Sequence, residues 1–211
     1  MRNPKKEPDR TAEQRILVSA REIFHKRGFE GARMQEIADK AGINKALLHY
    51  YFRSKEKLFD AVFDEALKAL LPKVKELLNA ELPLFDKIKY FTENYITLLM
   101  KNMYLPVFVI NEMYQNPEKF VGTFTEKNNI TPALFISQIN TAIKKKQIKS
   151  IDPKQLFVNL MSMCVYPFLA KPLLMKLYNL DEKGFVRFIK KRKKEIPEFI
   201  IDSIKLNSKS L

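Results

Sequence analysis

The sequence is poor in the residues that several protein classes need. Its 211 residues include one cysteine, two histidines, five glycines and no tryptophan. The single cysteine, Cys164, cannot form an internal disulfide, which excludes a disulfide scaffold and indicates a reducing compartment. Two histidines and one cysteine are too few for a convincing zinc site. We therefore predict no metal centre.

Long apolar runs and catalytic motifs are also missing. No run of 18 apolar residues occurs, and the charged N-terminus leads into no apolar segment. We therefore expect no membrane span, no signal peptide and a cytoplasmic location. The patterns G-x-S-x-G, H-E-x-x-H and C-x-x-C are absent, as is a glycine-rich phosphate loop. We predict that the chain is not an enzyme, has no catalytic residues and uses no cofactor.

Positive charge is abundant. Lys and Arg number 38 against 24 Asp and Glu, a net charge of +14. Residues 1–60 carry a net +5, residues 61–139 a net −1 and residues 140–211 a net +10. A basic protein suits a polyanionic partner, either nucleic acid or an anionic membrane surface. The densest cluster, Arg187–Lys194, is interpreted as a solvated helix face, with nucleic-acid or membrane contact as alternatives.

Helical periodicity dominates, so we predict an all-α fold. Thr11 is expected to cap a first helix that Gly28 ends, and Pro72 to stop or kink a long helix beginning at Lys55. Two short helices are predicted between them, at Met34–Lys40 and Lys45–Tyr51. Beyond Pro83, helices are predicted over Leu84–Lys101 and Pro106–Gln115, and from Thr131-Pro132, Asp152-Pro153 and Asp181. Glu126–Asn129 is expected to be a loop.

The two short helices are joined by Ala41-Gly42-Ile43-Asn44, a helix-turn-helix pattern. Gly42 is expected to take a positive φ, and Asn44 to cap the second helix. That helix would be ~10 Å long, which suits the DNA major groove. Its outward side chains would be Lys45, Ala46, His49 and Tyr50. Lys55 would favour a phosphate beside the free N–H groups that start the next helix.

The run from Gln35 to Leu58, QEIADKAGINKALLHYYFRSKEKL, with Gly28-Phe29 before it, resembles the DNA-binding signature of the tetracycline-repressor (TetR) family. The resemblance covers about the first quarter of the chain. It implies a homodimer on double-stranded DNA with a two-fold-symmetric operator. It also implies a three-helix DNA-binding head at 10–55 and a larger helical body at 56–211. The charged residues 1–9 are expected to form a flexible basic arm, with minor-groove contact as the alternative.

Site residues follow from the resemblance by position. The DNA-binding set is Arg33, Gln35, Asn44, Lys45, Ala46, Leu47, His49, Tyr50, Tyr51 and Lys55. Within it Tyr51 and Lys55 would hold phosphates, although core packing is an equal alternative for Tyr51. Three positions depart from the family pattern: Arg33 stands where Thr or Ser usually caps the helix, Ala46 where Gly is frequent, and His49 where Tyr is usual.

The resemblance also implies a small-molecule pocket and a dimer surface in the body. Flexible Met and rigid aromatic residues suit an adaptable apolar pocket, although core packing is the simpler interpretation for each one alone. The assigned lining is Tyr95, Leu99, Met103, Phe108, Met113, Met161, Cys164 and Phe168. The dimer surface is assigned to the apolar faces of the last two helices, at Leu156, Leu160, Phe199, Ile200 and Ile204.

The resulting hypothesis is a transcriptional repressor that a small, largely apolar effector releases from its operator. Activation in place of repression stays open, as do the effector and the operator sequence. Two alternatives remain: a DNA-binding dimer without a small-molecule effector, and a basic helical protein acting at anionic membrane surfaces.

Overall fold

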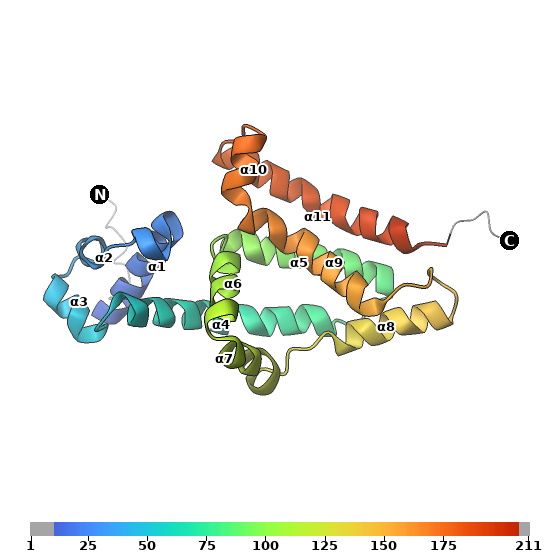
Figure 1. The fold of residues 1–211 in the computed structure, drawn as a ribbon, viewed down its shortest axis with the longest axis horizontal. Coiled ribbons are helices and arrows are strands. Elements are labelled where there is room, and N and C mark those ends of the chain that lie inside the picture. The colour runs from blue at the N-terminus through green and yellow to red at the C-terminus, as the bar shows by residue number, and fades with distance from the viewer. Residues whose placement is uncertain (1–10, 207–211) are drawn as a thin grey trace, which may run out of the picture. The chain divides into compact units, whose positions relative to one another are not determined.

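A computed structural model describes residues 11–206, which form helices joined by turns and short loops, with one isolated β-bridge between Ile148 and Lys205 (Figure 1). The all-α prediction is confirmed. The chain divides into two compact units that meet between Lys68 and Ala69, inside helix α4. The predicted arm at 1–9 lies outside the described residues.

The first unit contains α1 (Ala12–Gly31), α2 (Met34–Ala41), α3 (Lys45–Tyr51) and the first turns of α4 (Lys55–Asn79). Each helix turns an apolar face inward. The fully buried side chains of this core are Ile16, Ala20, Ile37, Ala38, Leu48 and Leu58.

The start of α4 packs within this first unit. The Phe59 ring lies edge-on to the rings of Phe24 and Phe29, with centroids 5.2 Å and 4.9 Å away. Arg21 and Glu65 form an ion pair of 2.7 Å. The division at Lys68 therefore differs from the sequence boundary at residue 55, because the first turns of α4 complete the core of the head.

The second unit holds the other helices. They are α5 (Leu84–Lys101), α6 (Leu105–Gln115), α7 (Pro117–Gly122), the π-helical turn η1 (Thr123–Lys127), α8 (Ala133–Lys144), α9 (Pro153–Leu169), α10 (Lys171–Leu177) and α11 (Glu182–Ile204). Helix α5 packs against α8, α9 and α11 (Figure 1). Its side chains Ile88, Phe91 and Ile96 are therefore buried.

Side-chain caps fix several of the predicted helix starts. Asn44 Oδ1 accepts a hydrogen bond from Leu47 N at 2.8 Å. Asp152 and Asp181 cap α9 and α11, accepting from Lys154 N and Gly184 N. Thr11 accepts from Gln14 N at 3.4 Å, as predicted. These starts could be read from sequence because the capping partner lies only two or three residues away.

One predicted loop differs from the structure: Glu126 and Lys127 belong to η1, so only the end of the predicted loop, Glu126–Asn129, lies outside a helix. Helix α4 continues through Pro72 to Asn79, so Pro72 does not stop it. Helix α9 ends at Leu169 and α10 starts at Lys171, with Pro172 in its first turn.

Within residues 11–206, no single helix has both the length and the apolar composition to cross a bilayer. Helices α9 and α10 reach that threshold only together, and a bend of 73° separates them.

Candidate nucleic-acid interface and ligand cavity

The turn between α2 and α3 has the geometry that the sequence predicts. Gly42 has φ 65° and ψ 38°, the left-handed region, and its N–H donates to the Asp39 carbonyl at 3.1 Å. The N–H of Ile43 donates to the Ala38 carbonyl at 3.1 Å. The Gly42 conformation ends α2 and lets Asn44 cap α3 two residues later.

Helix α3 has one buried side and one exposed side. Leu48 is fully buried, and Phe52, which ends the helix, is 8% exposed. The predicted outward residues Lys45, Ala46 and His49 are exposed, and Tyr50 is 80% exposed. Leu47 is half-buried at the edge. Leu48 and Phe52 therefore anchor α3, and its short outward face is open to a partner.

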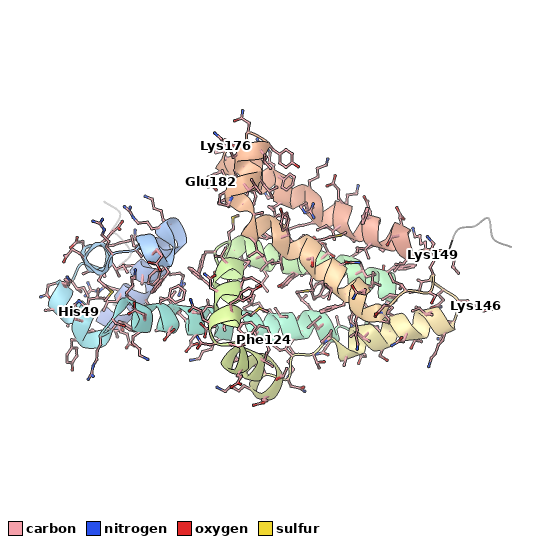
Figure 2. All side chains as sticks on the ribbon, viewed as in Figure 1. His49, Phe124, Lys146, Lys149, Lys176 and Glu182 are labelled. Atoms are coloured by element: carbon pink, nitrogen blue, oxygen red, sulfur yellow. The ribbon has the colours of Figure 1, made fainter. Side chains whose placement is uncertain are left out.

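Local hydrogen bonds orient several of these side chains. His49 lies on α3 (Figure 2), and its Nδ1 is 3.3 Å from the Arg53 carbonyl oxygen. Because a carbonyl oxygen only accepts, Nδ1 is the donor there, and Nε2 is left for an external contact. Gln35 Nε2 donates to Asp39 at 2.7 Å. Arg33 precedes α2 and gives it no side-chain cap, as its residue type predicts.

Tyr51 is less buried than a core residue. It is 41% exposed, and its ring lies edge-on to that of Tyr50 with centroids 5.6 Å apart. The exposure favours an external contact over core packing, which were equal alternatives for this residue.

Some cations of the first unit form ion pairs, but those around α3 do not. Arg27 pairs with Glu36 at 2.9 Å, and Lys40 with Glu22 at 2.8 Å. Within the described residues, Arg33, Lys45, Arg53 and Lys57 have no acidic partner, and α3 itself carries no carboxylate. Arg53 and Lys57 were not among the predicted contacts, although both follow α3 directly in sequence. Unpaired cations beside a protruding helix suit contact with phosphates.

Lys55 has internal partners as well. Its Nζ donates to the Phe29 and Glu30 carbonyls at 3.0 Å and 3.4 Å, and lies 4.4 Å from the Phe29 ring centroid. The ammonium therefore closes the C-terminal end of α1. One of its three N–H groups remains for a phosphate.

The second unit contains a partly open cavity of about 550 Å³. Most of its lining is aliphatic, aromatic or methionine. The lining residues are Leu70, Val74, Tyr95, Leu99, Leu105, Pro106, Val109, Ile110, Met113, Phe120, Phe124, Met161, Ser162, Val165, Tyr166 and Leu169. Phe124 lies on η1 (Figure 2), and its ring centroid is 4.6 Å from that of Phe120. The volume and composition are typical of a small-molecule site.

Four of the eight predicted pocket residues line this cavity: Tyr95, Leu99, Met113 and Met161. The assignment is corrected for the other four. Phe108, Cys164 and Phe168 are buried at 5%, 1% and 2% exposure outside the lining, and Met103 is also outside it. Helix α9 is apolar on two faces, and sequence alone does not indicate which face borders the cavity.

Cys164 is a small buried side chain. Burial raises the pKa of its thiol to about 12, against an opposing effect of Arg192. The thiol therefore stays protonated and unreactive near neutral pH.

The predicted dimer surface also needs correction. Leu156, Leu160, Ile200 and Ile204 are 0–2% exposed within one chain, because α9 and α11 use these faces to pack with α5 and each other. Among the five assigned residues, only Phe199, at 64% exposure, faces outward.

The basic cluster Arg187–Lys194 is only partly a solvated face. Arg192 donates to the Met163 carbonyl at 3.0 Å, and Lys193 Nζ to Thr97 Oγ1 at 2.7 Å. Arg187, Lys190, Lys191 and Lys194 are exposed.

Comparison with known proteins identifies the first unit. The family model "Bacterial regulatory proteins, tetR family" matches residues 16–62, which span α1 to the first part of α4. An uncharacterized HTH-type transcriptional regulator of Bacillus subtilis is 25% identical over 149 residues, 66% of this chain and 73% of that protein. The HTH-type transcriptional activator FasR of Mycolicibacterium smegmatis is 33% identical over 101 residues, 43% of this chain and 46% of that protein.

The fold extends the likeness to nearly the whole chain. The solved structure of a protein from Clostridium perfringens, assigned as a fatty acid metabolism regulator, superposes with a TM-score of 0.60 at 24% identity. That comparison covers 92% of this chain and 100% of the other. The relatives are DNA-binding regulators and not enzymes, which favours a regulator over a membrane-surface protein. The first unit therefore carries the DNA-binding module of the tetR family of bacterial regulatory proteins, and the chain as a whole is similar to regulators of that family.

Proposed function

We propose that this protein is a homodimeric transcriptional repressor that a small apolar effector releases from a two-fold-symmetric operator. Regulators of this family bind DNA as dimers. In the proposed complex, the outward face of α3 enters the major groove. Lys45, His49 and Tyr50 contact base edges there, while Tyr51 and Lys55 contact phosphates.

One observation carries the DNA-binding part of the proposal. Leu48 is fully buried, and its neighbours Lys45, His49 and Tyr50 are exposed with no acidic residue on the same helix. A hydrophobic anchor fixes the helix, and the exposed side presents hydrogen-bonding groups and unpaired cations. This combination suits a polyanion with readable base edges.

The effector part of the proposal rests on the cavity and on α4. Leu70 and Val74 of α4 line the cavity, and the same helix begins at Lys55 beside the proposed phosphate contacts. A ligand that prefers one position of α4 would change the separation of the two recognition helices. It shifts the equilibrium only as far as its affinities for the two states differ.

We place the dimer contact on the outward faces of α9 and α11. Val158 and Phe199 are 53% and 64% exposed there. After Glu182 and Lys183 at the start of α11, its exposed charges are ordered, with Arg187, Lys190, Lys191 and Lys194 preceding Glu195, Glu198 and Asp202. When a two-fold axis crosses such a helix at a right angle, the basic half of each copy faces the acidic half of its mate.

The test is an unbiased DNA selection. Purified protein would capture fragments from a random library at about physiological salt, where nonspecific binding weakens. We expect one two-fold-symmetric motif whose half-sites lie about one turn, ~34–36 Å, apart. The control is a His49→Ala, Tyr50→Ala double variant, which changes exposed side chains only and should enrich no motif. Folded, dimeric wild-type protein that enriches no motif would contradict the proposal.

Activation is the second candidate, because the Mycolicibacterium relative is a transcriptional activator. A reporter gene driven by the selected site would distinguish repression from activation. Lower expression with the protein present indicates repression, and higher expression indicates activation.

A further inference from the structure

The cavity combines an apolar wall with hydroxyl groups that have no partner. The polar side chains of the lining are Tyr95, Ser162 and Tyr166, and none of them forms a hydrogen bond within residues 11–206. No charged side chain is part of the lining. The site therefore offers hydrogen bonds but no counter-ion.

Tyr95 is the most enclosed of these groups. It is 8% exposed, and its ring stacks on Phe91 with centroids 5.2 Å apart. Burial raises the pKa of its hydroxyl far above the ordinary value, with a smaller effect of Cys164, so the group stays a neutral donor and acceptor. The Tyr95 hydroxyl has no protein partner at the cavity wall, so a ligand oxygen would give it a hydrogen bond in an apolar surrounding.

The rim differs from the interior. Tyr166 is 55% exposed, and Ser162 is exposed as well, so water can satisfy both hydroxyls. The Tyr95 hydroxyl is therefore the one that gains most from a hydrogen bond to a ligand.

Charge would exclude part of the ligands that fit by size. At ~30 Å³ for each non-hydrogen atom, 550 Å³ accommodates about 18 such atoms. A carboxylate or ammonium group on such a ligand would lose water without gaining an opposite charge. Selection between ligands of the same chain length would then depend on the charge of the headgroup.

We propose that the cavity selects an uncharged ligand with an extended apolar body and one hydrogen-bonding oxygen, which the Tyr95 hydroxyl binds. This inference rests on the proposed function, because it names the class of the effector.

The experiment compares decan-1-ol, decanoate and decylammonium by isothermal titration calorimetry on the full chain. The three probes share one alkyl chain and differ in headgroup charge. At pH 7.4 we expect decan-1-ol to bind at least ~100-fold more tightly than decanoate, because only the scarce protonated acid can enter. The apparent affinity for decanoate should rise about tenfold for each unit that the pH falls towards 5.5. Equal affinities for all three probes would show that the headgroup stays in water, and would overturn the inference, as would no binding of decan-1-ol.

The variant Tyr95→Phe tests the assigned residue. We expect a loss of about 5- to 10-fold for decan-1-ol, the effect of one hydrogen bond. The matched control Tyr166→Phe should change the affinity less than 2-fold, since that hydroxyl is exposed to water. Unchanged binding to Tyr95→Phe would overturn the role of Tyr95. The comparison of headgroups on the unaltered chain does not depend on either variant.

DNA binding separates this inference from the proposed function. Decan-1-ol that binds the cavity but leaves the affinity for the selected DNA unchanged would contradict an effector role. The ligand class would still stand. Release of DNA by decanoate and decan-1-ol at equal free concentrations would contradict the ligand class and support the regulatory function.

Discussion

At the scale of single residues, Lys87 places an amine in the apolar core of the second unit. It is fully buried on α5, and its Nζ has no hydrogen-bond partner within residues 11–206. The Nζ makes a cation–π contact with the Phe135 ring, whose centroid lies 5.5 Å away. Burial lowers the pKa of this amine below its ordinary value of 10.5. Such a side chain reduces stability whenever it is charged.

We expect Lys87→Met to stabilise the protein by about 1–3 kcal/mol near pH 7. With its pKa lowered in the folded state, Lys87 binds more protons in the unfolded state. Stability of the unaltered chain therefore rises with pH from the lowered pKa up to about 10.5, and the advantage of the variant shrinks over that range. Urea unfolding between pH 7 and 10 measures this, with Lys89→Met, an exposed lysine of the same helix, as control. A less stable Lys87→Met variant would contradict the prediction.

Tyr50 is the residue best placed to read bases, because it is 80% exposed on α3. We expect Tyr50→Ala to weaken binding to the selected site about 10- to 100-fold, the range of one good base contact. Binding to random DNA should change little, since phosphate contacts carry it. Fluorescence anisotropy on both DNAs measures the two effects. Equal losses on both would show that Tyr50 contacts only the backbone.

Lys55 has two roles that one substitution can separate. Lys55→Ala removes the hydrogen bonds to the Phe29 and Glu30 carbonyls, so we expect a loss of about 1–2 kcal/mol in stability. If its third N–H contacts a phosphate, as we propose, the slope of log K against log salt also falls by about one unit. A lower melting temperature with an unchanged slope would leave Lys55 with the structural role alone.

At the scale of elements, two glycines of the head interrupt helical backbone in different ways: Gly42 ends α2, and Gly28 breaks α1 before its last residues. Gly42 lies in the left-handed helical region, whereas Gly28 combines φ 68° with ψ −179°, a region that side chains hardly enter. A Cβ at Gly28 would meet no atom within 4 Å, and one at Gly42 would only touch Arg15 at 3.8 Å. Any cost of alanine at either position is therefore a backbone cost.

We expect Gly42→Ala to cost about 1 kcal/mol and Gly28→Ala about 2–3 kcal/mol. Chemical denaturation of the two variants beside the unaltered chain measures the difference. The two positions serve as controls for each other, because neither substitution creates a steric clash. A Gly28→Ala variant as stable as Gly42→Ala would show that the break in α1 can rearrange.

At the scale of the whole molecule, dimerisation is expected to depend on the outward face of α11. Phe199→Asp places a charge at the proposed centre of the contact, so we expect monomers at micromolar concentration and a large loss of affinity for a two-fold-symmetric site. Sedimentation velocity measures the association state. Tyr114→Asp is the matched control, because Tyr114 is 85% exposed on α6, outside the proposed contact. A dimeric Phe199→Asp variant would move the interface elsewhere.

The helical head is predictable from the amino-acid sequence, because the signals that define it are local. The Asn44 cap, the Gly42 turn and the apolar spacing around Leu48 all act within a few residues, so periodicity and capping rules predict them. The unpaired cations near α3 could be identified only from the structure, because the ion pairs of the neighbouring cations join residues on different helices.

The roles of the apolar residues in the body depend on how its helices pack, which the sequence does not reveal. Helix α9 carries apolar side chains on several faces, and packing with α5 and α11 buries Leu160 and Cys164 while leaving Met161 at the cavity. The same packing buries Lys87 and four residues that the sequence had assigned to the dimer surface: Leu156, Leu160, Ile200 and Ile204. In a helix with several apolar faces, the burial of each face depends on neighbours that are distant in sequence. Local periodicity does not show which neighbour each face contacts.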